Sequence, residues 1–377
     1  MDRSSHPLSA VVVTPPAGSD GDVPPESESL RRAFEEERRA TVSLLAPLLE
    51  HLHAVTAVAD LHSIRWQLAI TSWALERLVL RSRRGYRSFE RAWPRAANAY
   101  YQRLKLFGRE AAPGGLVDTL RYRAHADAAM SVLFEHRLSA MHRACIARCI
   151  VHERLHRELL LAHLKRLYWR NPALPVYALR PSVVHGPLRH DGSAAQAVSN
   201  AQYREFIRDG AYRDARLWSA HGWSFVRRGG WQRPLYWSPA LDAEHSLYGE
   251  LALDDTAAVC HLSFFEAQAY ACWSGTRLPT EPEWLALAAR RDRAKLPADS
   301  APEPVLDAAG HAAVWNWTAR PADDELRHEP CRPLPRARVL RGGSCVIGAP
   351  DPALRTSCAP EARHRFSGLS VIAPALH

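Results

Sequence analysis

The stretch that decides how this chain is organised is Val151–Leu167, which reads V-H-E-R-L-H-R-E-L-L-L-A-H-L-K-R-L. Its leucines recur every three or four positions, as expected for one face of an amphipathic helix. His152 and His156 stand at i and i+4, which places them on one helical face about 6 Å apart, close enough to share a metal ion. Because both fall on the apolar ridge, we predict that they face the interior of a helical domain.

The sequence before and around this stretch predicts a bundle. Residues 1–28 are rich in Pro, Ser, Gly and Asp, which predicts a disordered tail. Residues 29–170 carry amphipathic patterns near 29–53, 64–81 and 116–136, followed by the histidine helix. Four long amphipathic helices with polar connections favour an antiparallel four-helix bundle, in which metal sites are built from facing helices.

The second half of the chain differs from the first in composition and periodicity. Residues 171–190 contain several prolines, which cannot continue a helix, so we predict a linker there. Residues 191–377 are rich in Trp and Gly and show short segments with few long periodic runs. This pattern predicts an irregular domain with little regular sheet, and an α+β fold class for the whole chain.

The composition narrows the class of protein. With 377 residues, 47% hydrophobic and 24% charged, the chain is long enough for two domains and a sizeable core. The net charge of +9 comes from arginines spread along the whole length, and without a DNA-binding motif we predict no nucleic-acid partner. No run approaches the roughly 20 apolar residues of a membrane span, so we also predict no membrane partner. Seven cysteines without a tight framework favour reduced thiols and a cytoplasmic location.

Specific strings in the second half carry a family resemblance. They are V-S-N-A-Q-Y-R-E-F-I (Val198–Ile207), H-L-S-F-F-E-A-Q-A-Y-A-C-W-S-G-T-R-L-P-T-E-P-E-W (His261–Trp284), W-N-W-T (Trp315–Thr318) and V-L-R-G-G-S-C (Val339–Cys345). Together they resemble the formylglycine-generating-enzyme-like fold. With an N-terminal DinB-like four-helix bundle, the chain resembles the ergothioneine-type sulfoxide synthases, which are non-heme iron enzymes that join a thiol to a histidine-derived betaine with dioxygen.

The resemblance implies an iron(II) site of three histidines in the bundle, with open positions for dioxygen and the substrate thiol. His152 and His156 match two of these ligands. The third ligand matches Ile70, which cannot bind a metal. Gln67, one turn earlier, is the nearest polar candidate for the third position.

Other site positions also depart from the family pattern. The residue before the second histidine, which the resemblance assigns to betaine binding, is Leu155 instead of glutamine. Arg363 aligns with an arginine of the substrate loop and either receives a substrate carboxylate or makes a salt bridge. The family's catalytic tyrosine follows the W-N-W-T string, whereas all eleven tyrosines of this chain stand at or before Tyr270. Carboxylates that could orient a ligand imidazole are Glu76, Glu153 and Asp127.

Three functions follow as hypotheses. The first is an active iron(II)- and oxygen-dependent synthase acting on a small-molecule thiol and a histidine-derived substrate, with His152, His156 and either Gln67 or water at the metal. The second is a catalytically silent homologue that binds a ligand or a partner protein. The third is a copper-dithiolate oxidase, for which Cys345 and Cys358 are the nearest pair of thiols.

Overall fold

The structure of the protein is a computed structural model that describes residues 27–51, 58–89, 115–177, 195–290, 314–321, 337–344 and 351–374. The chain divides into two compact units, Pro16–Tyr177 and Ala178–His377, which we call the helical unit and the Trp/Gly unit. Most of the predicted tail and linker lies outside the described residues. No helix in the described part of the chain combines the length and apolar character that crossing a bilayer requires.

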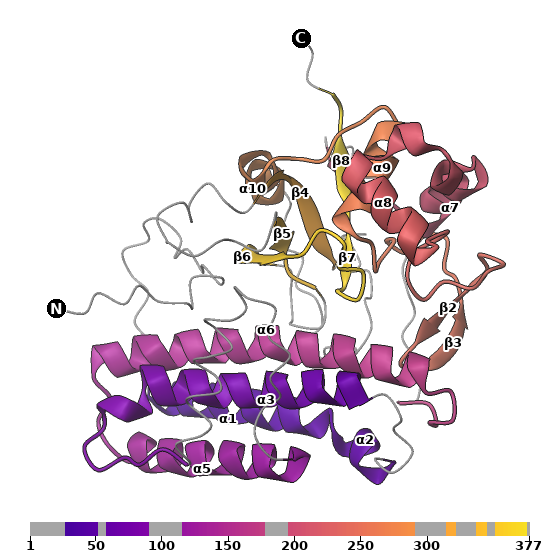
Figure 1. The fold of residues 1–377 in the computed structure, drawn as a ribbon. Coiled ribbons are helices and arrows are strands. Elements are labelled where there is room, and N and C mark those ends of the chain that lie inside the picture. The colour runs from indigo at the N-terminus through magenta and orange to yellow at the C-terminus, as the bar shows by residue number, and fades with distance from the viewer. Residues whose placement is uncertain are drawn as a thin grey trace. The chain divides into compact units, whose positions relative to one another are not determined.

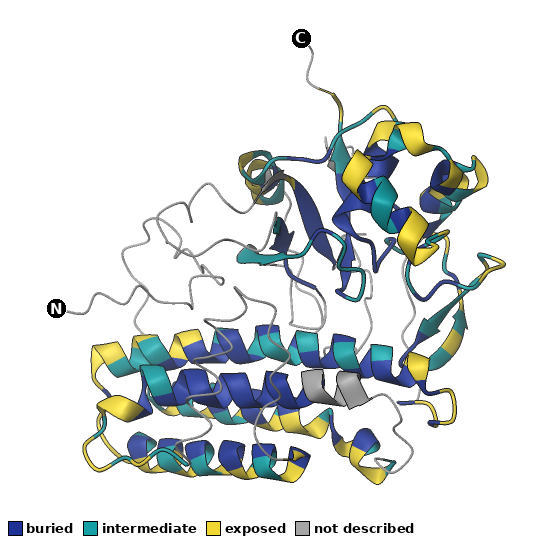
Figure 2. Cartoon of the chain, in the orientation of Figure 1, coloured by how far each residue is buried: buried dark blue, intermediate teal, exposed yellow. Residues whose placement is uncertain are grey.

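The helical unit is built from long helices that pack side by side (Figure 1). Its helices are α1 (Ser27–Ser43), α2 (Ala46–Glu50), α3 (Val58–Leu78), α5 (Leu116–Phe134) and α6 (Ala140–Arg170), with a short turn η3 (Leu80–Ser82). Helix α3 is buried without interruption from residue 64 to residue 76 (Figure 2). A helix buried on all sides is the central element of its unit, because neighbours must cover every face.

Helix α6, which carries the two histidines, has well-defined ends. Ser139 caps its start, since the Ser139 hydroxyl accepts a hydrogen bond from the backbone N–H of His142 at 3.1 Å. The helix stops before Asn171 and Pro172, where a proline ring would clash with the preceding turn. The predicted helix over Val151–Leu167 is confirmed, as part of a longer helix whose start at Ala140 was not predicted.

The first helical pattern, predicted to run to about residue 53, breaks into two helices. Helix α1 ends at Ser43, and α2 begins at Ala46 with Pro47 in its first turn. A proline is tolerated in the first turn of a helix but not in its interior. The apolar periodicity continues across the break, so periodicity alone concealed it.

One apolar cluster lies at the end of the helical unit where α3 meets η3. It includes Leu30, Phe34, Val79, Met130 and Ile146, all at most 5% exposed. Each such side chain contributes about 1.5–3 kcal/mol when removed from water. This cluster joins α1, α3, α5 and α6 independently of the histidine pair.

The Trp/Gly unit contains short strands and short helices. Its largest sheet has the order β6-β5-β4-β7, with β4 (Trp315–Pro321) antiparallel to β5 (Arg338–Gly342) and parallel to β7 (Ser367–Gly368), and with β6 (Asp351–Cys358) antiparallel to β5. Two-stranded sheets pair β1 (Ala195–Ala197) with β8 (Ser370–Ile372) and β2 (Ala243–Ser246) with β3 (Gly249–Ala252). The helices are α7 (Asn200–Arg208), η4 (Ala211–Arg213), η5 (Ala215–Leu217), α8 (Ala220–Gly229), α9 (Phe264–Trp273) and α10 (Glu281–Arg290).

Aromatic packing holds this unit together. Trp315 and Trp317 are fully buried in β4, and the indole N–H of Trp317 donates to the carbonyl of Leu262 at 2.9 Å. Gly342 has a φ of +99°, and a Cβ there would lie 2.8 Å from the Trp284 ring. A glycine is therefore required at this position of the R-G-G-S string. With helices and short strands in one chain, the predicted α+β class is confirmed.

Candidate functional site

Two histidines of α6 lie together in the helical unit. The ring centroids of His152 and His156 are 4.3 Å apart, with 54° between the ring planes. His152 is buried, with 8% of its surface exposed, and His156 is half-buried. The two imidazoles are close enough to share one ion, as the i, i+4 spacing predicts. Their role as metal ligands stays a prediction.

Gln67 of α3 holds the ring of His156. Its amide oxygen Oε1 lies 2.6 Å from Nδ1 of His156. Because an amide oxygen only accepts hydrogen bonds, Nδ1 of His156 donates the proton of this bond. Proteins orient metal-binding histidines through such a bond to the second ring nitrogen. Gln67, considered above as a third ligand, instead contacts one of the two histidines.

His152 is a neutral base in the folded protein. Burial lowers the pKa of His152 to about 4, and the neighbouring carboxylate of Glu153 only partly offsets this effect. Its buried Nδ1 has no hydrogen-bond partner among the described residues. A buried polar atom without a partner costs about 1–3 kcal/mol. This ring therefore offers the uncharged form of imidazole that metal binding requires.

The position that matches the third iron ligand is occupied by hydrocarbon. Ile70 is 1% exposed and stands one turn after Gln67 on the interior face of α3. In the described part of the chain, no three His, Cys, Asp or Glu side chains gather where they could hold a metal. Two imidazoles with an isoleucine at the position that matches the third ligand do not fit a three-histidine iron site, which needs a third donor there.

Leu155 occupies the position that the resemblance assigns to betaine contact. It is buried in the helical unit, with 5% of its surface exposed. An aliphatic side chain offers neither a hydrogen bond nor an aromatic face to a charged betaine. The side chain therefore serves packing, and a betaine-binding role for it stays a proposal.

A buried ionic cluster lies next to His152 in the sequence. Oε1 of Glu153 accepts a hydrogen bond from Nη2 of Arg123 at 2.6 Å, and its Oε2 accepts from Nη1 of Arg38 at 3.1 Å. All three residues are at most 5% exposed. Burial alone would raise the pKa of Glu153, but the guanidiniums of Arg123 and Arg38 hold it well below its usual range. The charged carboxylate thus ties α6 to α1 and α5.

The carboxylates predicted to orient an imidazole have other partners. Glu153 and Asp127 are bound by arginines. Glu76 is fully buried and accepts hydrogen bonds from the hydroxyl of Tyr122 at 2.9 Å and from that of Tyr86. Among the described residues no hydrogen bond joins any of the three to a histidine, so ion pairing and hydrogen bonding elsewhere account for their positions. The side chain that contacts a histidine ring is instead the amide of Gln67.

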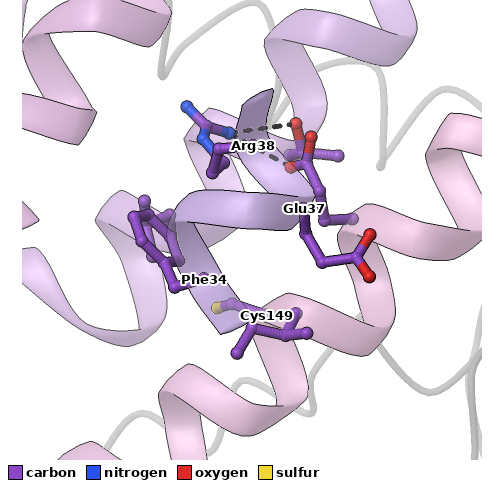
Figure 3. A pocket seen from close by; sticks show the side chains of 8 residues that line it. Phe34, Glu37, Arg38 and Cys149 are labelled. Carbon is purple, nitrogen blue, oxygen red and sulfur yellow. Dashed lines mark hydrogen bonds and ion pairs between the residues drawn. The ribbon is translucent and has the colours of Figure 1, made fainter. Parts of the chain in front are cut away.

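A small hollow of about 10 Å³, room for about one water molecule, lies at the ionic cluster (Figure 3). It is lined by Phe34, Glu37, Arg38, Thr71, Leu75, Cys149, Ile150 and Glu153. Burial raises the pKa of the Cys149 thiol to about 12, so this thiol is not a nucleophile at neutral pH. Glu37 is paired with Arg154 at 2.5 Å and with Arg157 at 3.0 Å. The hollow therefore presents paired charges and an unreactive thiol.

In the Trp/Gly unit, Arg363 is bound by a buried carboxylate. Its Nε and Nη2 donate to Glu266 at 3.0 and 2.9 Å, and the guanidinium carbon lies 4.5 Å from the ring centroid of Trp231. Glu266 is fully buried and also accepts from the hydroxyl of Tyr212 at 2.6 Å. A two-pronged arginine–carboxylate pair fixes the side chain firmly. These contacts favour the salt-bridge alternative for Arg363.

The cysteines give no support to a copper-dithiolate site. Cys358 in β6 is half-buried and forms no disulfide with another described cysteine. Cys345, the other member of the pair considered above, lies outside the described residues. The copper alternative therefore has no observation in its favour.

Sequence reasoning missed the two arginines that bind Glu153. Arg38 lies 115 positions from Glu153 along the chain, and Arg123 lies 30 positions from it. A signal was present in α1, where Arg38 follows Phe34 by one turn and so falls on the apolar face. A charged residue at such a position is buried only when it is paired.

Comparison with known proteins agrees with the resemblance. Residues 194–305 match the sulfatase-modifying factor enzyme 1-like domain. The chain is 32% identical over 225 residues to the hercynine oxygenase of Mycolicibacterium smegmatis, covering 46% of this chain and 50% of the relative. It is 33% identical over 217 residues to that of Mycolicibacterium thermoresistibile, covering 46% and 48%, and 41% identical over 90 residues to that of Mycobacterium tuberculosis, covering 23% and 20%. The chain spans about half the length of the first two relatives.

Proposed function

This chain is a divergent member of the ergothioneine-type sulfoxide synthase family, and on that premise we propose that it is a catalytically silent relative. In this proposal the helical unit corresponds to the family's DinB-like bundle. The chain keeps the family fold as a small-molecule- or partner-binding protein. It does not join a thiol to a histidine betaine with dioxygen.

The observation that carries the proposal is the buried Ile70. Its side chain is 1% exposed on α3, one turn from the glutamine that binds His156. A hydrocarbon side chain has no lone pair, and two imidazoles alone leave an iron(II) ion without the third protein ligand that open sites use.

Two further positions support the proposal. Leu155 replaces the polar residue before the second histidine and is buried at 5% exposure. No tyrosine follows Tyr270 in the sequence, so the region after the W-N-W-T string carries no phenol to act as an acid. The scaffold residues Trp315 and Trp317 remain fully buried. The changes therefore gather where the chemistry would take place.

A turnover assay tests the proposal. The purified chain is supplied with Fe(II) under argon, then with hercynine and a cysteine thiol, and finally with dioxygen, and the sulfoxide product is followed by mass spectrometry. We expect no product above a protein-free control, because the metal lacks its third ligand. The hercynine oxygenase of Mycolicibacterium smegmatis, treated in parallel, serves as the positive control. Product formed at repeated turnover by this chain would overturn the proposal.

An active synthase is the second candidate, and the bond between Gln67 and His156 favours it. Gln67 orients the ring of His156 through its Nδ1 atom, and His152 is neutral. In this alternative His152 and His156 bind iron(II) and water supplies the third donor, because the amide oxygen of Gln67 is already bound to Nδ1 of His156. The same assay separates the candidates, since only the second predicts product that is lost in Gln67→Ala.

A further inference from the structure

We propose that the helical unit contains a metal site that lacks one ligand, and that the residue at position 70 alone decides whether the unit binds a divalent transition-metal ion. The inference rests on the proposed function. If the chain is silent for the reason given above, a single donor atom placed at position 70 should create a tight site in the otherwise unchanged chain.

Two contacts fix the register of α3 against α6. Gln67 contacts His156 at 2.6 Å. Four residues later in α3, Thr71 shares Arg123 with Glu153, because Arg123 donates to Oγ1 of Thr71 at 2.9 Å and to Oε1 of Glu153 at 2.6 Å. The helices therefore run antiparallel, with residue 67 opposite residue 156 and residue 71 opposite residue 153. Position 70 lies between these two levels.

Position 70 lies on the same side of α3 as Gln67, whose amide contacts His156. Ile70 follows Gln67 by three residues, and residues so spaced lie on one helical face. Ile70 is 1% exposed and His152 is 8% exposed. A donor atom at position 70 would thus enter the same interior at the level of the histidine pair.

The histidine pair is already arranged as a partial ligand set. The ring centroids of His152 and His156 lie 4.3 Å apart, and Gln67 sets the proton of His156 on Nδ1. Metal–nitrogen bonds of about 2.0–2.1 Å can join both rings to one ion. Catalytic metal sites generally use three protein ligands. The histidine pair alone should therefore bind a metal ion only weakly, and a third donor should turn the pair into a tight site.

The surrounding structure holds the pair in place without a metal. Glu153, adjacent to His152, is bound by Arg38 at 3.1 Å and by Arg123 at 2.6 Å. These charges fix α6 against α1 and α5 whatever residue stands at position 70. Isoleucine and histidine have similar volumes, so an imidazole at position 70 needs little extra room, and a bound metal would offset the cost of burying its nitrogens.

Cobalt(II) titration of the full-length chain tests the inference, with wild type, Ile70→His and Ile70→Cys compared by absorption spectroscopy. Cysteine behaves as a small apolar side chain when buried, so Ile70→Cys provides a folded variant if the imidazole does not fit. We expect both variants to bind one Co(II) per chain at least about 100-fold more tightly than wild type, since even outer-shell partners change metal affinity 10–100-fold. Ile70→Cys should add a thiolate-to-cobalt charge-transfer band in the near ultraviolet.

Two controls show whether the new ligand acts together with the pair. The double variants Ile70→His with His156→Ala and Ile70→Cys with His156→Ala keep the new donor and remove one imidazole, so each should lose the gain in affinity. The inference is overturned if both folded single variants bind Co(II) no more tightly than wild type. It is also overturned if wild type binds one Co(II) per chain as tightly as the variants, or if the double variants retain the gain.

The outcomes distinguish this inference from the proposed function. Failure of the variants to bind Co(II), with no turnover by wild type, would refute the role of position 70 and leave the silent relative standing. Sulfoxide formation by wild type would refute the silent relative directly, whatever the variants bind.

Discussion

Ile70 and Gln67 lie one turn apart on α3 and differ in what their side chains can offer a metal site. Gln67 keeps a hydrogen bond to His156 at 2.6 Å, which is the kind of contact that prepares a histidine for a metal. Ile70 is 1% exposed and supplies only hydrocarbon. The site therefore keeps the residue that orients His156 and lacks a third side chain that could bind a metal.

The buried His152 should make stability depend on pH. Burial lowers the pKa of His152 to about 4, from an ordinary value of 6.5, so the folded state binds fewer protons at this ring than the unfolded chain between these values. The stabilisation from the neutral ring is complete above about pH 6.5 and is lost as pH falls toward 4, by on the order of 3 kcal/mol. Urea unfolding of His152→Gln should therefore show a shallower pH slope in this window than wild type. Equal slopes would show that the ring titrates alike in both states.

Between elements, the ionic cluster around Glu153 joins α6 to α1 and α5. Glu153→Gln leaves Arg38 and Arg123 buried without their shared carboxylate, so we expect the free energy of unfolding to fall by about 3–5 kcal/mol. Glu35→Gln is the matched control, because Glu35 pairs with Arg31 at the surface of α1 and such pairs contribute about 0–1 kcal/mol. Urea denaturation measures both variants. A loss in Glu153→Gln no larger than in Glu35→Gln would contradict the role of the cluster.

The sequence predicts elements well where the signal is local. His152 and His156 are one helical turn apart, and the cap at Ser139 stands beside the helix that it starts, so both could be found from the sequence. The contact between Arg38 and Glu153 spans 115 positions, and no local pattern encodes it. The strands were harder to predict for the same reason, since β7 has only 2 residues and its pairing partner β4 lies far away in the sequence.

For the whole molecule, the contacts that hold the fold are complete among the described residues, whereas the residues that would hold a metal are not. In the Trp/Gly unit, Arg363 and Tyr212 hold the buried Glu266, as a structural centre requires. In the helical unit the packing around α3 is continuous from residue 64 to residue 76, although the ligand set within it is incomplete. A chain that keeps the contacts which hold its fold and lacks those that would hold a reactive metal is the pattern we expect of a silent relative.

The most direct test of this account is the amount of iron that the wild-type chain retains. The folded protein is equilibrated with Fe(II) under argon at neutral pH, dialysed against metal-free buffer, and analysed for iron and protein. We predict far less than one iron per chain, because Ile70 offers no third ligand beside His152 and His156. Retention of about one iron per chain, lost in His156→Ala, would contradict the account.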